Sequence, residues 1–320
     1  MKHLLSIEGL DPAAARQILD RSAHFKQGRG AHATLPLAGQ TWALIFSKSS
    51  TRTRVSFEVG ISELGGHPLF LNANDIQLGR GEPIQDTARV LGRMVHGAVI
   101  RTYAQSDVEQ FAEHSGIPTI NALTDAEHPC QILTDIFTYE EKRGPIAGKV
   151  VAFVGDGACN VPLSWIFAAA KLGFELRIAA PPAYRPPLAL LQRAGLTHVF
   201  SRPAAGDEVI TGTAPNGGKV VLMGDPHEAA QGADLLYTDV WVSMGMEAET
   251  ERRLKDLAAY QIDDALVALA KPGALVMHCL PAYRDKEIHA STFETHAATI
   301  FDQAENRLHT QKAILDWITS

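Results

Sequence analysis

Short apolar segments of β type alternate along this chain with segments that carry helix start signals, and no other feature constrains the fold as strongly. The clearest candidate strands are Thr41–Phe46, Ala98–Arg101, Lys149–Val154, Glu175–Ala179, Asp234–Tyr237 and Ala274–Cys279. Such alternation usually produces parallel sheets with right-handed crossovers, because each helix returns the chain to the same end of the sheet. We therefore predict an α/β protein built from doubly wound parallel sheets.

Several segments between the strands begin with recognisable capping residues. Asp-Pro pairs at residues 11–12 and 225–226 supply a side-chain cap followed by proline in the first helical turn. The spacing of Ser106 and Glu109 matches a capping box. We predict that a helix starts at each of these places.

The length of the chain and a break in its pattern predict two domains. A chain of 320 residues is longer than one average domain. Within residues 139–149, a charged helix end is followed by Gly144, Pro145 and Gly148, which interrupt regular structure. We therefore expect the domain boundary near residue 143. The polar, glycine-rich residues 201–219 are expected to form a surface excursion.

Charge and cysteine usage argue against several classes of protein. The net charge of −7 gives no long-range attraction for nucleic acid or an anionic membrane. Glu8 and Asp11 interrupt the apolar core of a signal peptide, and no later run approaches the ~18 apolar residues of a membrane span, so we expect a cytoplasmic protein. Cys130, Cys159 and Cys279 are odd in number and far apart, which matches neither a disulfide framework nor a zinc spacing.

Polar residues of unusual type follow the predicted strands at their carboxyl ends. In open parallel sheets this edge gathers helix N-termini and binds ligands. The residues concerned are Ser47–Arg54, Arg101, Asn160, Asp239–Met244 and Cys279. We therefore expect the candidate site at these edges.

The segment SKSSTRTRVSFE at residues 47–58 is the strongest of these signals. A helix that begins near Thr53 or Arg54 would place residues 50–53 around its N-terminus, where unpaired N–H groups and the helix dipole favour an anion. Hydroxyl groups and a guanidinium add further donors, so the segment predicts a site for a phosphate-sized dianion. A well-capped helix with solvated arginines explains the segment equally well when it is considered alone.

Residues 128–131, HPCQ, predict a helix start with two polar side chains on one side. Pro129 in the first helical position would leave His128 at the helix entrance, with Gln131 about one turn further on. A neutral imidazole and a carboxamide can both donate to a carbonyl oxygen. An ordinary helix start is the alternative, and a metal site is weaker still because no carboxylate or second histidine keeps ligand spacing.

The second half of the chain offers polar groups in three places. Asp239 could accept an ammonium group, and Ser243 with the backbone after it could hold a carboxylate. Cys279 ends a strand as a lone thiol, which is more often a small core residue. The turn at residues 155–160, GDGACN, lacks the third glycine of a dinucleotide site, and the strand that follows lacks the ribose-binding acid. Both absences disfavour NAD binding. Asn160 then remains as the residue of this turn that could contact a ligand.

Taken in order, these motifs resemble those of the carbamoyltransferase family, and within it the branch that acts on ornithine. The matching segments are residues 50–54 (STRTR), 78–91 (LGRGEPIQDTARVL), Arg101, 128–131 (HPCQ), 239–245 (DVWVSMG), 278–282 (HCLPA) and Arg307 within ENRLHTQKAIL. The resemblance spans nearly the whole chain, and several motifs in order are far more specific than any single one.

The resemblance implies transfer of a carbamoyl group from carbamoyl phosphate to the side-chain amine of L-ornithine, which gives L-citrulline and phosphate in arginine biosynthesis. It implies an active site in the cleft between domains and between subunits of a homotrimer, or of a higher assembly of trimers, without a metal or an organic cofactor. The carbamoyl phosphate domain would comprise residues 1–143 and a C-terminal helix at 303–320, and the ornithine domain residues 144–302.

The same resemblance implies a role for each site residue. Carbamoyl phosphate would be bound by Ser50, Thr51, Arg52, Thr53, Arg101, His128, Pro129, Cys130, Gln131, Cys279, Leu280 and Arg307, with Gln77 delivered from the neighbouring subunit. Ornithine would be bound by Asn160, Asp239, Ser243 and Met244. The catalytic residues would be Arg101, His128, Asp239 and Cys279, and the Cys279 thiolate or an adjacent water would accept the proton of the amine.

Two alternatives and one departure accompany this interpretation. N-acetylornithine or putrescine could be the amine, although the intact segment 243–245 favours a substrate with a carboxylate. A non-catalytic phosphate or amino-acid sensor on the same scaffold would not need His128, Gln131 and Cys279 together. Cys159 departs from the family pattern, because many relatives carry asparagine at this position.

Overall fold

The chain folds into two compact units. The computed structural model describes residues 1–32, 34–76, 81–201 and 208–320. The first unit consists of Met1–Phe137 and Glu305–Ser320, and the second of Thr138–Ala304. The two divisions lie within helices α5 (Pro129–Arg143) and α11 (Ala290–Thr319). Each unit contains strands and helices in alternation, which confirms the predicted α/β class.

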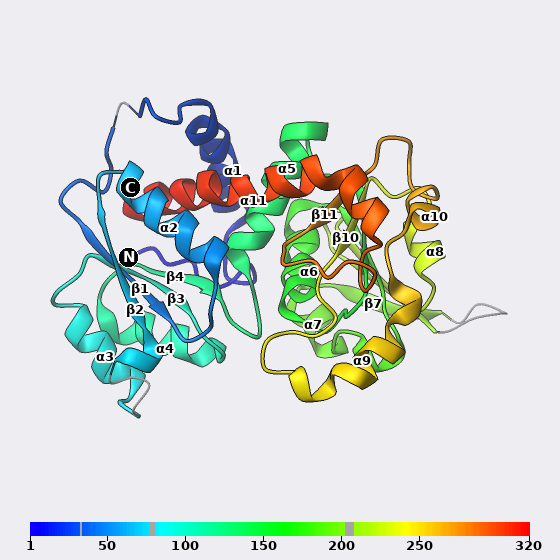
Figure 1. Cartoon of the computed structure of the whole chain (residues 1–320), viewed down its shortest axis with the longest axis horizontal. Coiled ribbons are helices and arrows are strands. Elements are labelled where there is room, and N and C mark those ends of the chain that lie inside the picture. Colours follow the sequence, from blue (N-terminus) through cyan, green and yellow to red (C-terminus); the bar gives the residue numbers. More distant parts are fainter. Residues whose placement is uncertain (33, 77–80, 202–207) are drawn as a thin grey trace. The chain divides into compact units, whose positions relative to one another are not determined.

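The first unit is built on a four-stranded parallel sheet (Figure 1). The sheet order is β2-β1-β3-β4. Its elements are α1 (Pro12–Gln27), β1 (Thr41–Phe46), α2 (Thr51–Glu63), β2 (His67–Asn72), α3 (Ile84–Leu91), β3 (Gly97–Arg101), α4 (Gln105–Ser115) and β4 (Thr119–Leu123). Helices α3 and α4 pack on one face of this sheet through a core that includes Ala88, Val108 and Phe111, while α2 lies on the other face (Figure 1). Burial on both faces explains why β1, β3 and β4 are mostly apolar.

The second unit is built on a seven-stranded sheet in the order β11-β10-β5-β6-β9-β8-β7. Its strands are β5 (Val150–Val154), β6 (Glu175–Ala179), β7 (Thr197–Ser201), β8 (Val209–Thr213), β9 (Lys219–Met223), β10 (Leu235–Thr238) and β11 (Leu275–His278). Its helices besides α11 are α6 (Asn160–Leu172), α7 (Leu188–Arg193), α8 (Pro226–Ala230), α9 (Thr250–Asp256) and α10 (Asp264–Val267). Trp165 of α6 packs edge-on against Tyr237 of β10, with ring centroids 5.6 Å apart. Residues of α8 and α10 belong to a separate buried cluster with β5, β10 and β11.

The predicted strands all occur, with ends that differ by no more than one residue from the predicted ones. The prediction of a surface excursion is wrong for Val209–Thr213, which forms β8 and pairs antiparallel with both β7 and β9. Four of its five residues are β-branched, which lets this short segment pair despite its polar surroundings. Residues 202–207 of the excursion lie outside the described residues.

Two of the three predicted helix starts are confirmed. The side chains of Asp11 and Asp225 cap α1 and α8, each with proline in the first turn. The capping box at Ser106 is wrong, because α4 begins at Gln105 with Ala104 at the capping position and no side-chain cap. Helix α2 also begins earlier than predicted, at Thr51, because Ser50 caps it.

No helix in the described part of the chain combines the length and apolar character that a membrane crossing requires.

Candidate active site

The N-terminus of α2 presents the first group of predicted binding residues. Ser50 is its N-cap, and the Ser50 hydroxyl accepts a hydrogen bond of 3.3 Å from the Thr53 backbone N–H. A pocket of about 460 Å³ is lined in part by Ser50, Thr51 and Arg54. Helix N-termini bind anions because their first N–H groups lack backbone acceptors. The geometry therefore suits the predicted dianion site.

The two arginines of this segment differ in their surroundings. Arg54 donates to Glu58 over 2.9 Å, and its guanidinium lies 3.5 Å from the centre of the Phe70 ring. The half-buried Arg52 side chain has no hydrogen-bond or ion-pair partner among the residues that the structure describes. Arg52 is therefore available for an anion, whereas Arg54 already has partners.

A buried chain of hydrogen bonds joins α2, α5 and α11 within the first unit. Arg307 of α11 donates to the Thr53 hydroxyl over 3.0 Å and to Gln131 Oε1 over 2.5 Å. Gln131 in turn donates through Nε2 to Asp135 over 2.7 Å. The structure thus brings together Thr53, Gln131 and Arg307, which lie far apart in the sequence. Asp135 was not predicted, although it lies one helical turn after Gln131 on the same face.

Arg101 and His128 lie in the same charged environment as Arg307. Arg101 ends β3 beside Phe46, the last residue of β1, and both Arg101 and His128 are buried. Burial holds the pKa of His128 well below its usual value, and the positive charges of Arg307 and Arg101 lower that pKa further. His128 is therefore a neutral imidazole at physiological pH, as the prediction of a hydrogen-bond donor requires.

The remaining predicted residues of the first unit differ in what they can offer. Pro129 is the first residue of α5. The buried thiol of Cys130 donates to the Asn121 carbonyl over 3.3 Å, and burial raises its pKa to about 12. A Cys130 contact with substrate would therefore come from its backbone. Gln77 lies outside the described residues.

Lys48 is a charged residue of this unit that sequence reasoning missed. It is buried, forms an ion pair with Asp125, and lies 4.3 Å from the centre of the Tyr103 ring. Lys48 precedes α2 and Asp125 precedes α5, so the ion pair ties together the two loops that carry the predicted binding residues. Its position inside the SKSS segment was the available signal.

Strand register brings Asp239 and Cys279 together in the second unit. Thr238 of β10 pairs with His278 of β11, so Asp239 and Cys279 are the next residues on two adjacent parallel strands. The Cys279 thiol donates to Asp239 Oδ1 over 2.9 Å, and the Val240 N–H donates to the same oxygen over 2.8 Å. The sulfur thus carries the proton in this arrangement.

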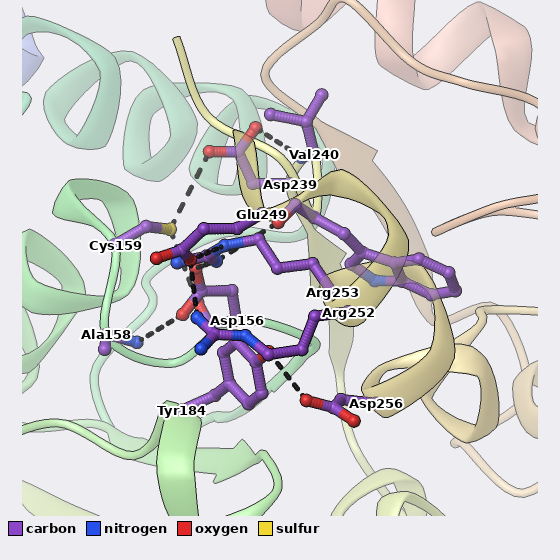
Figure 2. A network of polar contacts seen from close by, with 11 residues as sticks. Asp156, Ala158, Cys159, Tyr184, Asp239, Val240, Glu249, Arg252, Arg253 and Asp256 are labelled. Carbon is purple, nitrogen blue, oxygen red and sulfur yellow. Dashed lines mark hydrogen bonds and ion pairs between the residues drawn. The ribbon is translucent and has the colours of Figure 1, made fainter. Parts of the chain in front are cut away.

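A network of charged residues centred on Arg253 lies near Asp239 (Figure 2). Arg253 of α9 donates to Asp156 over 2.6 Å, to Glu249 over 2.8 Å and to the Trp241 carbonyl over 3.2 Å. Asp156 belongs to the turn after β5, and Trp241 to the loop after Asp239. Arg253 therefore ties the loop of residues 239–245 to the turn that precedes α6, and no sequence signal had marked it.

Cys159 lies near Asp239 Oδ2, whereas Cys279 contacts Oδ1. The Cys159 sulfur lies 4.0 Å from Asp239 Oδ2 and donates to the Asp156 carbonyl over 3.3 Å (Figure 2). Burial raises the pKa of Cys159 well above its usual value, and the charges of Asp156 and Asp239 raise it further. Cys159 is therefore a neutral thiol at physiological pH and a poor nucleophile.

His278 and Glu287 support the strand end that carries Cys279. The Leu280 N–H donates to His278 Nδ1 over 2.9 Å, so Nε2 carries the ring proton and donates to the buried Glu287 over 3.1 Å. The atoms of Asp239, His278 and Cys279 that could ligate a metal ion lie within 4.8 Å of one another. Both ring nitrogens of His278 already have partners, so these residues do not fit a metal site.

The other residues predicted for ornithine lie around the same strand ends. Asn160 is the first residue of α6, directly after Cys159. Ser243 is half-buried and Met244 is exposed, and the Ser243 carbonyl accepts from the Met246 N–H over 3.0 Å. Leu280 lies in the second unit with a φ of 61°, a left-handed backbone conformation that non-glycine residues seldom adopt.

Comparisons with known proteins place the chain in a family. Two family domain models match it: the aspartate/ornithine carbamoyltransferase carbamoyl-P binding domain at residues 2–141, and the Asp/Orn binding domain at residues 147–318. The chain belongs to the aspartate/ornithine carbamoyltransferase family. This membership confirms the resemblance that the motifs predicted.

Individual members of this carbamoyltransferase family match the chain over nearly its full length. An ornithine carbamoyltransferase of Akkermansia muciniphila is 55% identical over 98% of this chain and 97% of its own length. The solved anabolic ornithine carbamoyltransferase of Campylobacter jejuni is 38% identical with a TM-score of 0.89, covering 99% of both chains. That of Pyrococcus furiosus is 42% identical with a TM-score of 0.86, covering 98% of this chain and 96% of its own.

The lowered pKa of His128 predicts a stability that depends on pH. In the unfolded chain this histidine takes up a proton near pH 6.5, whereas the folded protein keeps it neutral. Below about pH 6.5 the unfolded state therefore binds more protons, and the free energy of unfolding should fall by up to ~1.4 kcal/mol per pH unit from this group. Urea unfolding at pH 5 and pH 7 measures the effect.

The matched variant for this measurement is His128→Gln, because it keeps a polar side chain that cannot titrate. Other histidines with a lowered pKa, such as His32 and His309, are present in both proteins. The wild type should lose more stability than the variant between pH 7 and pH 5. Equal losses would show that His128 binds protons alike in the folded and unfolded chains.

Proposed function

We propose that the protein is an ornithine carbamoyltransferase, which transfers the carbamoyl group of carbamoyl phosphate to the side-chain amine of L-ornithine and releases L-citrulline and phosphate. We assign carbamoyl phosphate binding to residues 1–143 with the C-terminal helix, and ornithine binding to residues 144–302. The full-length similarity to proteins named ornithine carbamoyltransferase supports this assignment. The similarity to an anabolic relative supports a role in arginine biosynthesis. We propose that the protein acts in the cytoplasm.

The buried position of Arg307 carries the carbamoyl phosphate part of the proposal. Its guanidinium contacts Thr53 at the α2 N-terminus and Gln131 on α5, and it lowers the pKa of the neighbouring His128. An arginine so deeply buried requires several polar partners, and an anion beside α2 would add another. Ser50, Thr51 and Arg52 would complete the phosphate contacts.

The transferred group needs donors where charge develops. Attack of an amine on the carbamoyl carbon builds negative charge on the carbamoyl oxygen. Arg101 and neutral His128 can both donate to that oxygen, and each such donor contributes about 3 kcal/mol when it is held in place beforehand. The leaving phosphate keeps its negative charge, which Arg52 and the α2 N–H groups would stabilise.

The attacking amine must lose a proton before it reacts. At a lysine-like pKa of about 10.4 it is mostly protonated at neutral pH, and about three pK units correspond to about 4 kcal/mol. Asp239 can receive the ammonium group and orient it, while Cys279 donates to the other side of the same carboxylate. The Cys279 contact favours the carboxylate over the thiolate as the base.

The identity of the amine can be tested directly. Product formation from carbamoyl phosphate should be fastest with L-ornithine, because putrescine has no carboxylate for Ser243 and N-acetylornithine carries a blocked α-amine. The measurement is a steady-state colorimetric assay of the ureido product with each of the three amines. Preference for either other amine would reassign the substrate, and no turnover despite carbamoyl phosphate binding would favour a sensor.

We further propose a homotrimer in which Gln77 completes the site of a neighbouring subunit, as the resemblance implies. Assayed at carbamoyl phosphate near the wild-type KM, Arg52→Ala and Gln77→Ala should each be nearly inactive when purified alone. An equal mixture of the two variants, unfolded and refolded together, should form trimers at random. Each site then has an even chance of an intact Arg52 and an even chance of an intact Gln77 from its neighbour, so about one quarter of the sites should be active. Light scattering should report three chains, and a mixture without recovery would show that each subunit supplies its own site.

A further inference from the structure

The orientation of the Gln131 side chain follows from its two buried partners. Arg307 has only donors, so the contact of 2.5 Å must be to the amide oxygen of Gln131. The Asp135 carboxylate accepts over 2.7 Å, so the amide nitrogen must face Asp135. Gln131 is 1% exposed and Asp135 is 0% exposed, which keeps water from replacing either contact. Sequence reasoning had expected the carboxamide to act as a donor, and one N–H of its amide nitrogen donates to Asp135.

We infer that Asp135 is a positioning residue that holds the Gln131 amide with its oxygen toward the substrate amide, and that it thereby selects carbamoyl phosphate against acetyl phosphate. This inference rests on the proposed function. The carbamoyl group carries an NH₂ that can donate to the second lone pair of Gln131 Oε1. Acetyl phosphate has a methyl group at the same place, which cannot donate.

The chemistry of this contact explains why orientation matters. A site that is built to hydrogen-bond an NH group rejects an analogue that lacks it, because the buried acceptor then stays unpaired. A reversed Gln131 would present its NH₂ to the substrate NH₂, which is unfavourable, and would lose the contact with Arg307. Asp135 makes the reversed state costly, because two carbonyl or carboxylate oxygens would then face each other.

The test compares two ligands in the same protein. Steady-state assays give the KM for carbamoyl phosphate and the inhibition constant of acetyl phosphate as a competitor. In Asp135→Ala the ratio of the inhibition constant to KM should fall by about tenfold or more. Asp135→Asn keeps an oxygen acceptor and should retain most of the wild-type ratio. A general loosening of the site would weaken both ligands alike and leave the ratio unchanged.

A control and a second variant separate orientation from folding. Thr134→Ser alters packing at the buried residue beside Asp135 but keeps the hydroxyl that donates to the Cys130 carbonyl, and its ratio should match the wild type. If Asp135→Ala does not fold, Gln131→Met removes the oriented amide while it keeps the length of the side chain, and its ratio should fall in the same way. An unchanged ratio in folded Asp135→Ala, or in Gln131→Met, would overturn the inference.

These outcomes are distinct from failure of the proposed function. Wild-type protein that forms no citrulline from carbamoyl phosphate and ornithine would refute the function itself. Active wild-type protein whose ratio does not respond to Asp135→Ala or Gln131→Met would refute only the positioning role.

Discussion

Arg52→Ala should raise the KM for carbamoyl phosphate by about 100-fold or more, since two charge-assisted hydrogen bonds to phosphate contribute about 3 kcal/mol together. Arg52 lies in the first turn of α2, and its guanidinium has no hydrogen-bond or ion-pair partner among the described residues, so its removal breaks no such bond there. The fold should therefore survive. Steady-state kinetics at saturating ornithine measure the change, and thermal unfolding checks the fold.

Arg54→Ala is the matched control, because it removes the same charge two residues further along the same helix. Arg54 already contacts Glu58 and the Phe70 ring. Its loss should change the KM for carbamoyl phosphate far less than the loss of Arg52. If both variants raise KM equally, the phosphate senses only the total charge near α2, and the specific role assigned to Arg52 is wrong.

Asp239→Asn should lower kcat/KM for ornithine by about 100-fold or more, within the range that a general base contributes. Asparagine keeps the shape of the side chain and can still accept from Cys279 and Val240. It can neither take a proton nor balance the charge of an ammonium group. The KM for carbamoyl phosphate should change little, because Ser50, Thr51 and Arg52, which we propose to contact the phosphate, belong to the first unit. Steady-state kinetics with each substrate varied in turn give both constants.

Cys279→Ser tests the thiol beside Asp239. A serine hydroxyl can also donate to Asp239, so this variant should retain more activity than Asp239→Asn if the carboxylate is the base. A larger loss in Cys279→Ser than in Asp239→Asn would instead assign the proton transfer to sulfur. The pH dependence of kcat in both variants, from pH 7 to pH 10, distinguishes the two schemes.

Local sequence patterns were sufficient to predict most of the framework. Thr41–Phe46 and Glu175–Ala179 form strands with the predicted bounds, because a short apolar run between turn residues is buried on both faces of a parallel sheet. The caps at Asp11 and Asp225 are equally local, since the side chain bonds to N–H groups two or three residues later. Ser106 failed as a cap because α4 begins two residues earlier than that cap requires, at Gln105.

Pairing between distant residues could not be predicted in this way. Val209–Thr213 was missed as a strand because it lies within a polar, glycine-rich segment and pairs with β7 and β9 only in the folded sheet. The ion pair between Lys48 and Asp125, and the contacts of Arg253 with Asp156, depend on loops that meet only after the sheets have formed. The substrate roles of the individual residues stay predictions that the variants above can test.

The sequence alone determined the α/β class and the family. Each strand pattern and each motif consists of residues close together in the chain, and the order of the motifs can be read directly from the sequence. Only the tertiary structure decided which groups touch: the Cys279 thiol on Asp239, and the Gln131 amide between Arg307 and Asp135. Side-chain orientation depends on partners from other elements, and a carboxamide has no preferred direction until those partners are in place. For this reason the direction of the Gln131 carboxamide, with its nitrogen toward Asp135, could not be predicted from the sequence.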